Sequence, residues 1–184
     1  AVVDKFTMGL TVFSEAPEQP LPEEINPRLP EDDYQALRNW ILPPVYDRLK
    51  AGQGEFLTEL RPTTAFFLRF GGLDYDGDPQ AGDKLDRFIR WVQNVLQQYD
   101  ATLIQLTVGD KGSYLYASFG APIAHEDDSR RALRVALELQ TPTADMGISD
   151  IAIGVAQGTM RTGAYGGITR RTYGVLGDDV NLAA

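Results

Sequence analysis

The chain has 184 residues, of which 43% are hydrophobic, and its 17 Lys and Arg against 26 Asp and Glu give a formal net charge of −9. This composition is typical of a globular domain, and the length suffices for one buried core. The absence of cysteine excludes disulfide scaffolds, thiolate zinc sites and thiol catalysis, and the single histidine excludes a two-histidine mechanism.

The acidic balance argues against nucleic acid as a partner, and no apolar run approaches the roughly 20 residues that span a bilayer. The N-terminus carries no signal-peptide pattern, so we expect a cytoplasmic protein without a membrane segment. It also lacks a start methionine, and the chain stops inside a predicted helix. We therefore expect a piece of a longer protein.

The first third of the chain differs from the rest. Apolar and polar residues alternate along 6–13, which predicts a strand. Seven of the 11 prolines follow within 16–44, together with a run of acids. Proline fixes φ and removes a backbone donor, and charge opposes burial, so 16–33 predicts an extended linker. Two short helices are predicted after it, over 34–42 and 45–49.

We place the main domain at residues 60–184 and assign residues 1–59 to the N-terminal strand, the linker and the short helices. Apolar spacing alternates along this domain between the period of strands and that of helices. The predicted elements are strands at 63–70, 102–108, 113–119, 150–156 and 171–176, helices at 83–99, at 127–139 and from 178, and a glycine-rich turn at 163–167. The order β-α-β-β-α-β-β-α predicts an α+β, ferredoxin-like sandwich, with a mainly antiparallel sheet and helices on one face.

Single residues give weaker signals. The three aspartates of loop 74–78 are similar to the start of a calcium loop but lack its distal acid, so a solvated acidic loop is the favoured interpretation. His125 precedes a polar helix start, which favours a capping or surface role. The arginine pair 170–171 could contact a phosphate, although a solvated basic pair is the simpler interpretation.

Four segments carry a joint pattern. Residues 66–72 form a strand that ends in Gly-Gly, the hairpin ends in Phe119-Gly120, 153–158 read Ile-Gly-x-x-x-Gly, and 173–184 read Tyr-x-x-x-Gly-x-x-Val-Asn-x-Ala. In this order they resemble the class III nucleotidyl cyclase catalytic domain, the family of adenylyl and guanylyl cyclases. The resemblance spans the whole main domain. The sequence of the hairpin turn, residues 108–112, further resembles the second catalytic domain of soluble, bicarbonate-responsive adenylyl cyclases.

The resemblance implies a reaction and an active site to which two domains contribute different residues. The family attacks the α-phosphate of ATP with the 3′-hydroxyl, which forms cyclic AMP and pyrophosphate with the help of two Mg or Mn ions. Two aspartates of one domain hold the metals. The partner domain supplies a Lys and an Asp or Thr that read adenine, an Asn that orients the ribose and an Arg that stabilises the transition state.

The positions that hold the metal-binding aspartates in the family are altered in this chain. The first metal-binding aspartate falls at Arg69, which cannot ligate a cation and would repel one. The second falls at Asp110 or, counted back from Phe119-Gly120, at Ser113; Asp110 is also an ordinary turn residue. We therefore assign no metal to this domain and expect the partner domain to hold Mg or Mn.

The nucleotide half is partly present. Asn181 matches the ribose-orienting Asn, although an Asn at a helix start also commonly satisfies backbone groups. Gly174 falls at the position of the adenine-reading Asp or Thr. The adenine-reading Lys falls at Gln105 or Leu106, of which only Gln105 can hydrogen-bond a base. The Arg position lies just past Ala184.

The favoured hypothesis is therefore the complementary nucleotide-binding half of an adenylyl cyclase, with ATP as its ligand and no activity on its own. Its partner is a metal-bearing cyclase domain in the same chain or a homodimer mate. The alternative is a non-enzymatic, degenerate cyclase-homology domain that regulates a partner cyclase or effector domain. A third possibility, a ferredoxin-like binding module unrelated to cyclases, is permitted by the element order alone.

Overall fold

The computed structural model describes residues 41–52, 58–109, 112–167 and 171–184, which belong to one compact unit. The predicted N-terminal strand and linker, and all but the last two residues of the first short helix, lie outside the described residues. The second short helix is present as α3, Pro43–Lys50, and the prolines at its start suit the first helical turn, where an N–H has no partner. Among the described helices, none is long and apolar enough to cross a membrane.

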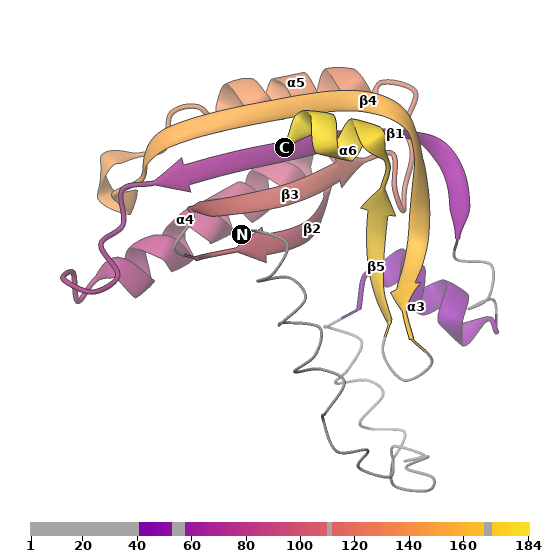
Figure 1. Cartoon of the computed structure of the whole chain (residues 1–184), viewed down its shortest axis with the longest axis horizontal. Coiled ribbons are helices and arrows are strands. Elements are labelled where there is room, and N and C mark those ends of the chain that lie inside the picture. Colours follow the sequence, from indigo (N-terminus) through magenta and orange to yellow (C-terminus); the bar gives the residue numbers. More distant parts are fainter. Residues whose placement is uncertain (1–40, 53–57, 110–111, 168–170) are drawn as a thin grey trace, which may run out of the picture. The chain divides into compact units, whose positions relative to one another are not determined.

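The main domain has the predicted order of elements. These are β1 (Glu59–Gly71), α4 (Ala81–Gln98), β2 (Thr102–Thr107), β3 (Ser113–Phe119), α5 (Asp128–Glu138), a short 3₁₀ helix (Ala144–Met146), β4 (Ser149–Gly166), β5 (Arg171–Leu176) and α6 (Asp178–Ala183). All strand pairs are antiparallel, in the order β2-β3-β1-β4-β5 (Figure 1). The α+β prediction is confirmed.

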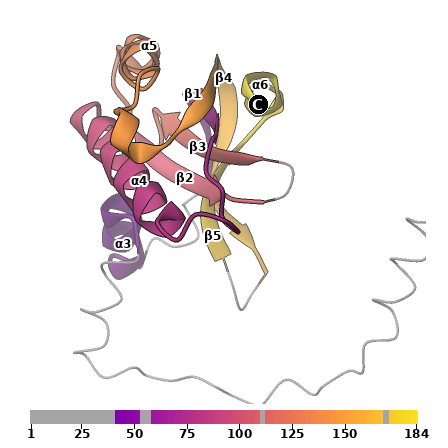
Figure 2. The same cartoon turned by 90° about the vertical axis from the view of Figure 1, so that its left-hand side faces the viewer.

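Helices α4 and α5 cover one face of the sheet, as predicted (Figure 2). Every second residue of β1 and β3 points to this face and meets the apolar stripe of α4. Phe66, Phe88 and Phe119 are fully buried there. The rings of Phe70 and Phe88 lie 4.8 Å apart between centroids. Each such side chain stabilises the fold by about 1.5–3 kcal/mol.

Helix α6 departs from the one-face prediction, because it packs on the opposite face of the sheet, against β4 (Figure 2). The close approach needs glycine. A Cβ placed on Gly154 would overlap the backbone carbonyl of Ala183, and a Cβ on Gly158 would overlap the carboxylate of Asp179. The Ile-Gly-x-x-x-Gly pattern therefore provides the flat surface on which α6 lies.

Strands β4 and β1 are longer than predicted, and the predicted glycine-rich turn at 163–167 is wrong. β4 continues to Gly166 because it has two successive partners. It pairs with β1 over its first part and with β5 from Arg161 onward. β1 begins early enough to include Pro62, where β3 no longer pairs with it, so the missing N–H of proline is tolerated.

The second half of β4 bends away with β5, so that this hairpin stands across the rest of the sheet (Figure 1). β2 and β5 are the two edge strands of the sheet, yet they contact each other. The space between these strands holds the candidate site.

Candidate functional site

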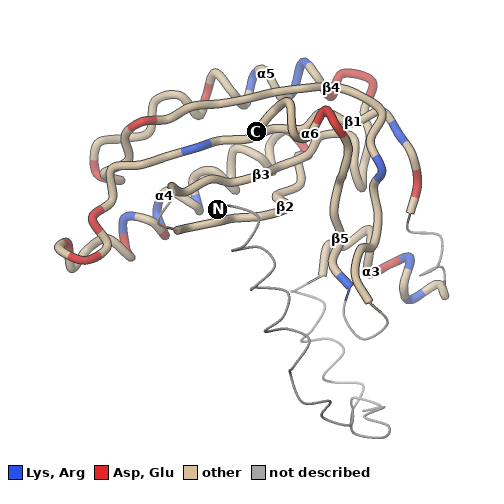
Figure 3. Tube along the Cα trace, viewed as in Figure 1, with Lys and Arg blue, Asp and Glu red and all other residues tan. Residues whose placement is uncertain are grey.

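A cavity of about 580 Å³ lies where β2 and the β4–β5 hairpin approach each other. Its lining residues are Ile104, Gln105, Tyr116, Tyr165, Gly166, Thr172, Tyr173, Gly174, Val175 and Leu176. The structure thus brings together Gln105 and Gly174, the two positions predicted to contact the base. Among the described lining residues none carries a charged side chain, and β2 and β3 carry none either (Figure 3).

Gln105 is exposed on β2, and its side-chain nitrogen donates a hydrogen bond to Oγ1 of Thr107 at 3.0 Å. The amide still offers a second N–H and its carbonyl oxygen, one donor and one acceptor. The pairing of β2 with β3 shifts between Leu103 and Gln105. This bulge explains why the consecutive residues Ile104 and Gln105 both line the cavity, whereas Leu106 does not.

Three tyrosines give the cavity its aromatic character. The Tyr116 ring stacks on Phe67 with centroids 4.5 Å apart, and its hydroxyl donates to the carbonyl oxygen of Val175 at 3.0 Å. The Tyr165 hydroxyl donates to the carbonyl oxygen of Arg161. Burial raises the pKa of Tyr116 and, to a smaller extent, the pKa values of Tyr165 and Tyr173. All three are therefore neutral phenols at physiological pH.

Asn181 lies outside the cavity lining. It sits exposed on α6, which follows β5 directly through Gly177. Among the described residues, no hydrogen bond involves the Asn181 side chain and no side chain caps α6. The alternative role for Asn181, satisfying backbone groups at the helix start, thus has no geometric support in the described residues.

The two described metal positions of the family pattern lie on opposite faces of the sheet. Arg69 is exposed and pairs with Tyr114, whereas Ser113 is 6% exposed and pairs with Phe70. Paired residues share a face, and Phe70 belongs to the core beneath α4. Asp110 lies outside the described residues. In the described part of the chain no group of three or more His, Cys, Asp or Glu side chains is placed to hold a metal ion.

The acidic loop 74–78, between β1 and α4, uses its carboxylates internally (Figure 3). Asp74 accepts hydrogen bonds from the backbone N–H groups of Asp76 and Gly77. Asp78 pairs with the Lys84 ammonium at 2.6 Å, and this hydrogen bond holds the pKa of Asp78 below its usual value. Of the basic pair 170–171, only Arg171 is described, and its guanidinium donates to the carbonyl oxygen of Gly167.

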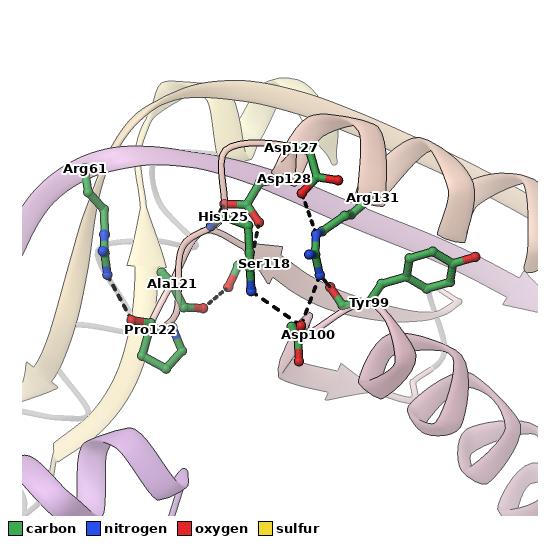
Figure 4. Close-up of polar contacts among 10 residues, drawn as sticks. All are labelled: Arg61, Tyr99, Asp100, Ser118, Ala121, Pro122, His125, Asp127, Asp128 and Arg131. Atoms are coloured by element: carbon green, nitrogen blue, oxygen red, sulfur yellow. Dashed lines mark hydrogen bonds and ion pairs between the residues drawn. The ribbon is translucent and has the colours of Figure 1, made fainter.

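His125 lies in a cluster with three aspartates and an arginine that the sequence did not indicate (Figure 4). Its ring nitrogens lie 3.4 Å from carboxylate oxygens of Asp100 and Asp128. Arg131 pairs with Asp100 at 3.0 Å and with Asp127 at 2.7 Å. These contacts join the turn after α4 to the start of α5. None of the residues lines the cavity, which indicates a structural role.

The sequence missed the tyrosines of the cavity. Tyr165 falls in the segment that its glycines marked as a turn. The signal that could have found it is the continued strand composition of β4, with Thr159 and Thr162 spaced among the glycines. Tyr116 was placed on its strand, but its contact with β5 depends on the bend of the β4–β5 hairpin.

Comparison with known proteins gives relatives but no matching family model. Over 131 residues, 70% of this chain, the sequence is 30% identical to adenylate cyclase type 10 of Homo sapiens. It is 27% identical to adenylate cyclase type 10 of Rattus norvegicus over 163 residues, 88% of the chain. The chain spans only 8% and 10% of the lengths of these relatives.

Among solved structures, the chain is similar to the guanylyl cyclase Cya2, with a TM-score of 0.60 and 23% identity over 69% of each chain. The adenylyl cyclase CyaB from P. aeruginosa gives a TM-score of 0.55 and 20% identity, over 68% of this chain and 70% of that one. These likenesses show a shared fold.

Proposed function

We propose that this chain, a homologue of adenylate cyclase type 10 with the fold of the class III cyclase catalytic domains, forms the complementary nucleotide-binding half of an adenylyl cyclase site. A second cyclase domain that carries the metal-binding residues, placed in the same polypeptide, completes the site. Together they convert ATP to cyclic AMP and pyrophosphate.

The observation that carries the proposal is the cavity in which Gln105 and Gly174 meet. A purine base is planar, and its edge carries both donors and acceptors. A glutamine amide can pair with the adenine edge through two hydrogen bonds. Neutral aromatic walls accept the faces of the base, and the phosphates then extend out of the cavity, away from its described lining, which carries no charged side chain.

The metal ions of the reaction belong to the partner domain in this proposal. Arg69 occupies one metal position of this chain. It is exposed on the face of the sheet opposite α4 and α5, which we call the open face, and its charge repels a cation there. This chain contributes base contacts from Gln105 and a ribose contact from the exposed amide of Asn181. No step assigned to it passes through a metal.

The test is cyclic AMP formation from ATP with Mn²⁺. This chain alone is compared with a longer polypeptide that also carries a preceding cyclase domain and the residues that follow position 184. We expect activity only in the longer polypeptide, and a loss of at least tenfold on Asn181→Ala within it. Activity of the chain alone, or an unchanged rate in Asn181→Ala, would contradict the proposal.

The exposed Arg69 also supports a second candidate, a non-enzymatic domain that regulates a partner cyclase or effector domain. In this second candidate function, the domain binds its partner but contributes no residue to catalysis. Activity of the longer polypeptide that survives both Gln105→Ala and Asn181→Ala, but is lost on deletion of this domain, would favour regulation.

A further inference from the structure

Tyr165 takes up the space that a side chain at position 174 would use. Tyr165 on β4 pairs with Thr172 of β5, so it lies two register positions from Gly174, which pairs with Gly163. A Cβ placed on Gly174 would lie 3.1 Å from Cδ2 and 3.4 Å from Cε2 of the Tyr165 ring. The ring therefore lies directly against the glycine, and a methyl group at 174 would force it to shift by a few tenths of an ångström.

The Tyr165 hydroxyl is already occupied. It donates to the carbonyl oxygen of Arg161, four residues back on the same strand. This bond fixes the tip of the side chain while Gly174 supports the ring. With its one proton committed, what Tyr165 offers to the cavity is chiefly the ring, and it has no further hydrogen-bond donor.

The opposite side of the cavity supplies the complementary chemistry. Gln105 and Ile104 of β2 line it, and Gln105 provides a donor and an acceptor without a charge. A ligand suited to this arrangement is flat and uncharged, with a polar edge for Gln105 and a face for the ring. A purine base has these properties.

We propose that Tyr165 is the platform on which the base stacks, so that in this chain an aromatic face replaces a reading side chain at position 174. The inference rests on the proposed function, since it concerns the base of the bound nucleotide. Stacking accepts every base, because each has a π-face. Tyr165 therefore sets the affinity for adenine and guanine alike, and the distinction between them depends on Gln105.

The experiment measures binding of ATP, GTP and inorganic triphosphate to this chain by calorimetry. Inorganic triphosphate carries no base and reports binding through phosphate alone. We expect Tyr165→Leu to weaken ATP and GTP by a similar factor, roughly 5- to 100-fold for the loss of one base–aromatic stack, and to leave inorganic triphosphate unchanged. Tyr165→Phe, which keeps the ring, should bind within about twofold of the wild type by the same argument.

A control variant and a second test variant accompany Tyr165→Leu. Tyr75→Leu removes a tyrosine that is 47% exposed in the loop before α4 and should bind all three ligands as the wild type does. Gly174→Ala keeps the Tyr165 ring but places a Cβ 3.1 Å from it, so the ring must shift by a few tenths of an ångström, and this variant should weaken ATP and GTP by a smaller factor than Tyr165→Leu does. Circular dichroism verifies the fold of each variant.

The outcomes separate the two proposals. If ATP binds more tightly than inorganic triphosphate, yet Tyr165→Leu and Gly174→Ala bind it as Tyr75→Leu does, the stacking role is wrong and the base site stands. If ATP binds the wild type no better than inorganic triphosphate, the base site itself fails, and the stacking role fails with it. A loss in Tyr165→Leu for ATP but not GTP would also overturn the inference, because stacking does not read the base edge.

Discussion

The face of the sheet under α4 and α5 and the face that carries α6 are built from different residues. Beneath the two long helices, β1 and β3 present large apolar side chains that are fully buried. On the other face, small residues such as Ala65 and Ala156 alternate with larger ones such as Phe67 and Met160, and β3 presents Tyr116. The first face is a closed core, and the second leaves room for a short helix and a cavity. The comparison separates the side chains that stabilise the fold from those that shape the site.

The largest expected effect is on the closed face. Phe66→Ala removes a fully buried ring that meets Phe119 edge-on at 6.1 Å. We expect a loss of about 3–5 kcal/mol in the free energy of unfolding, from lost transfer energy and the cavity left behind. Urea unfolding measures it. A loss below about 1 kcal/mol would show that this face is not the principal core.

Gly154→Ala tests the open face. The added methyl would overlap the Ala183 backbone, so α6 must move, at a cost of about 1–3 kcal/mol typical of overpacking. Hydrogen exchange should speed up in α6 and remain slow in α4. Gly82→Ala is the matched control, because nothing lies within 4 Å of a Cβ there, and alanine in a helix should stabilise the protein by about 0.5–1 kcal/mol. Equal destabilisation by both variants would contradict the role of Gly154.

Tyr116→Phe tests the bond between the cavity wall and β5. The ring stack on Phe67 remains, but the hydrogen bond to the Val175 carbonyl is lost. We expect a loss of about 1 kcal/mol in the free energy of unfolding at pH 7.

The same hydroxyl gives a pH dependence. Burial raises the pKa of Tyr116 above its ordinary value of 10.0, so the folded protein retains this proton more strongly than the unfolded chain does. The resulting stability is fully present below pH 10.0 and is lost as the pH rises beyond it. Unfolding at pH 7 and pH 10.5 should therefore show a steeper alkaline loss for the wild type than for Tyr116→Phe. Parallel losses would mean that another group titrates.

Asp127→Asn should give the smallest effect, because the Asp127–Arg131 pair is only partly buried and solvent screens it. The hydrogen bond from Arg131 lowers the pKa of Asp127 below 3.8, so the stability from this pair is present above that pH and lost as the pH falls through the lowered value. Wild type and variant should differ slightly in urea at pH 7 and converge near pH 2. A difference that persists at pH 2 would contradict this assignment.

The alternation of side chains along a strand could have shown from the sequence that Ser113 faces the helices. Ser113 and Phe119 are an even number of residues apart on the same strand, so both must point to the same face. That face is the core beneath the helices, which separates Ser113 from Arg69.

The sequence by itself determined the order and type of the elements from β1 onward, because apolar periodicity is a local property that each element carries in its own residues. It also placed Gln105 and Gly174 on separate strands as base-contacting candidates. The tertiary structure decided that the two meet in one cavity, that Tyr165 lies on Gly174, and that α6 lies on the open face. These depend on the bend of β4 and on contacts between distant residues, which no local pattern encodes.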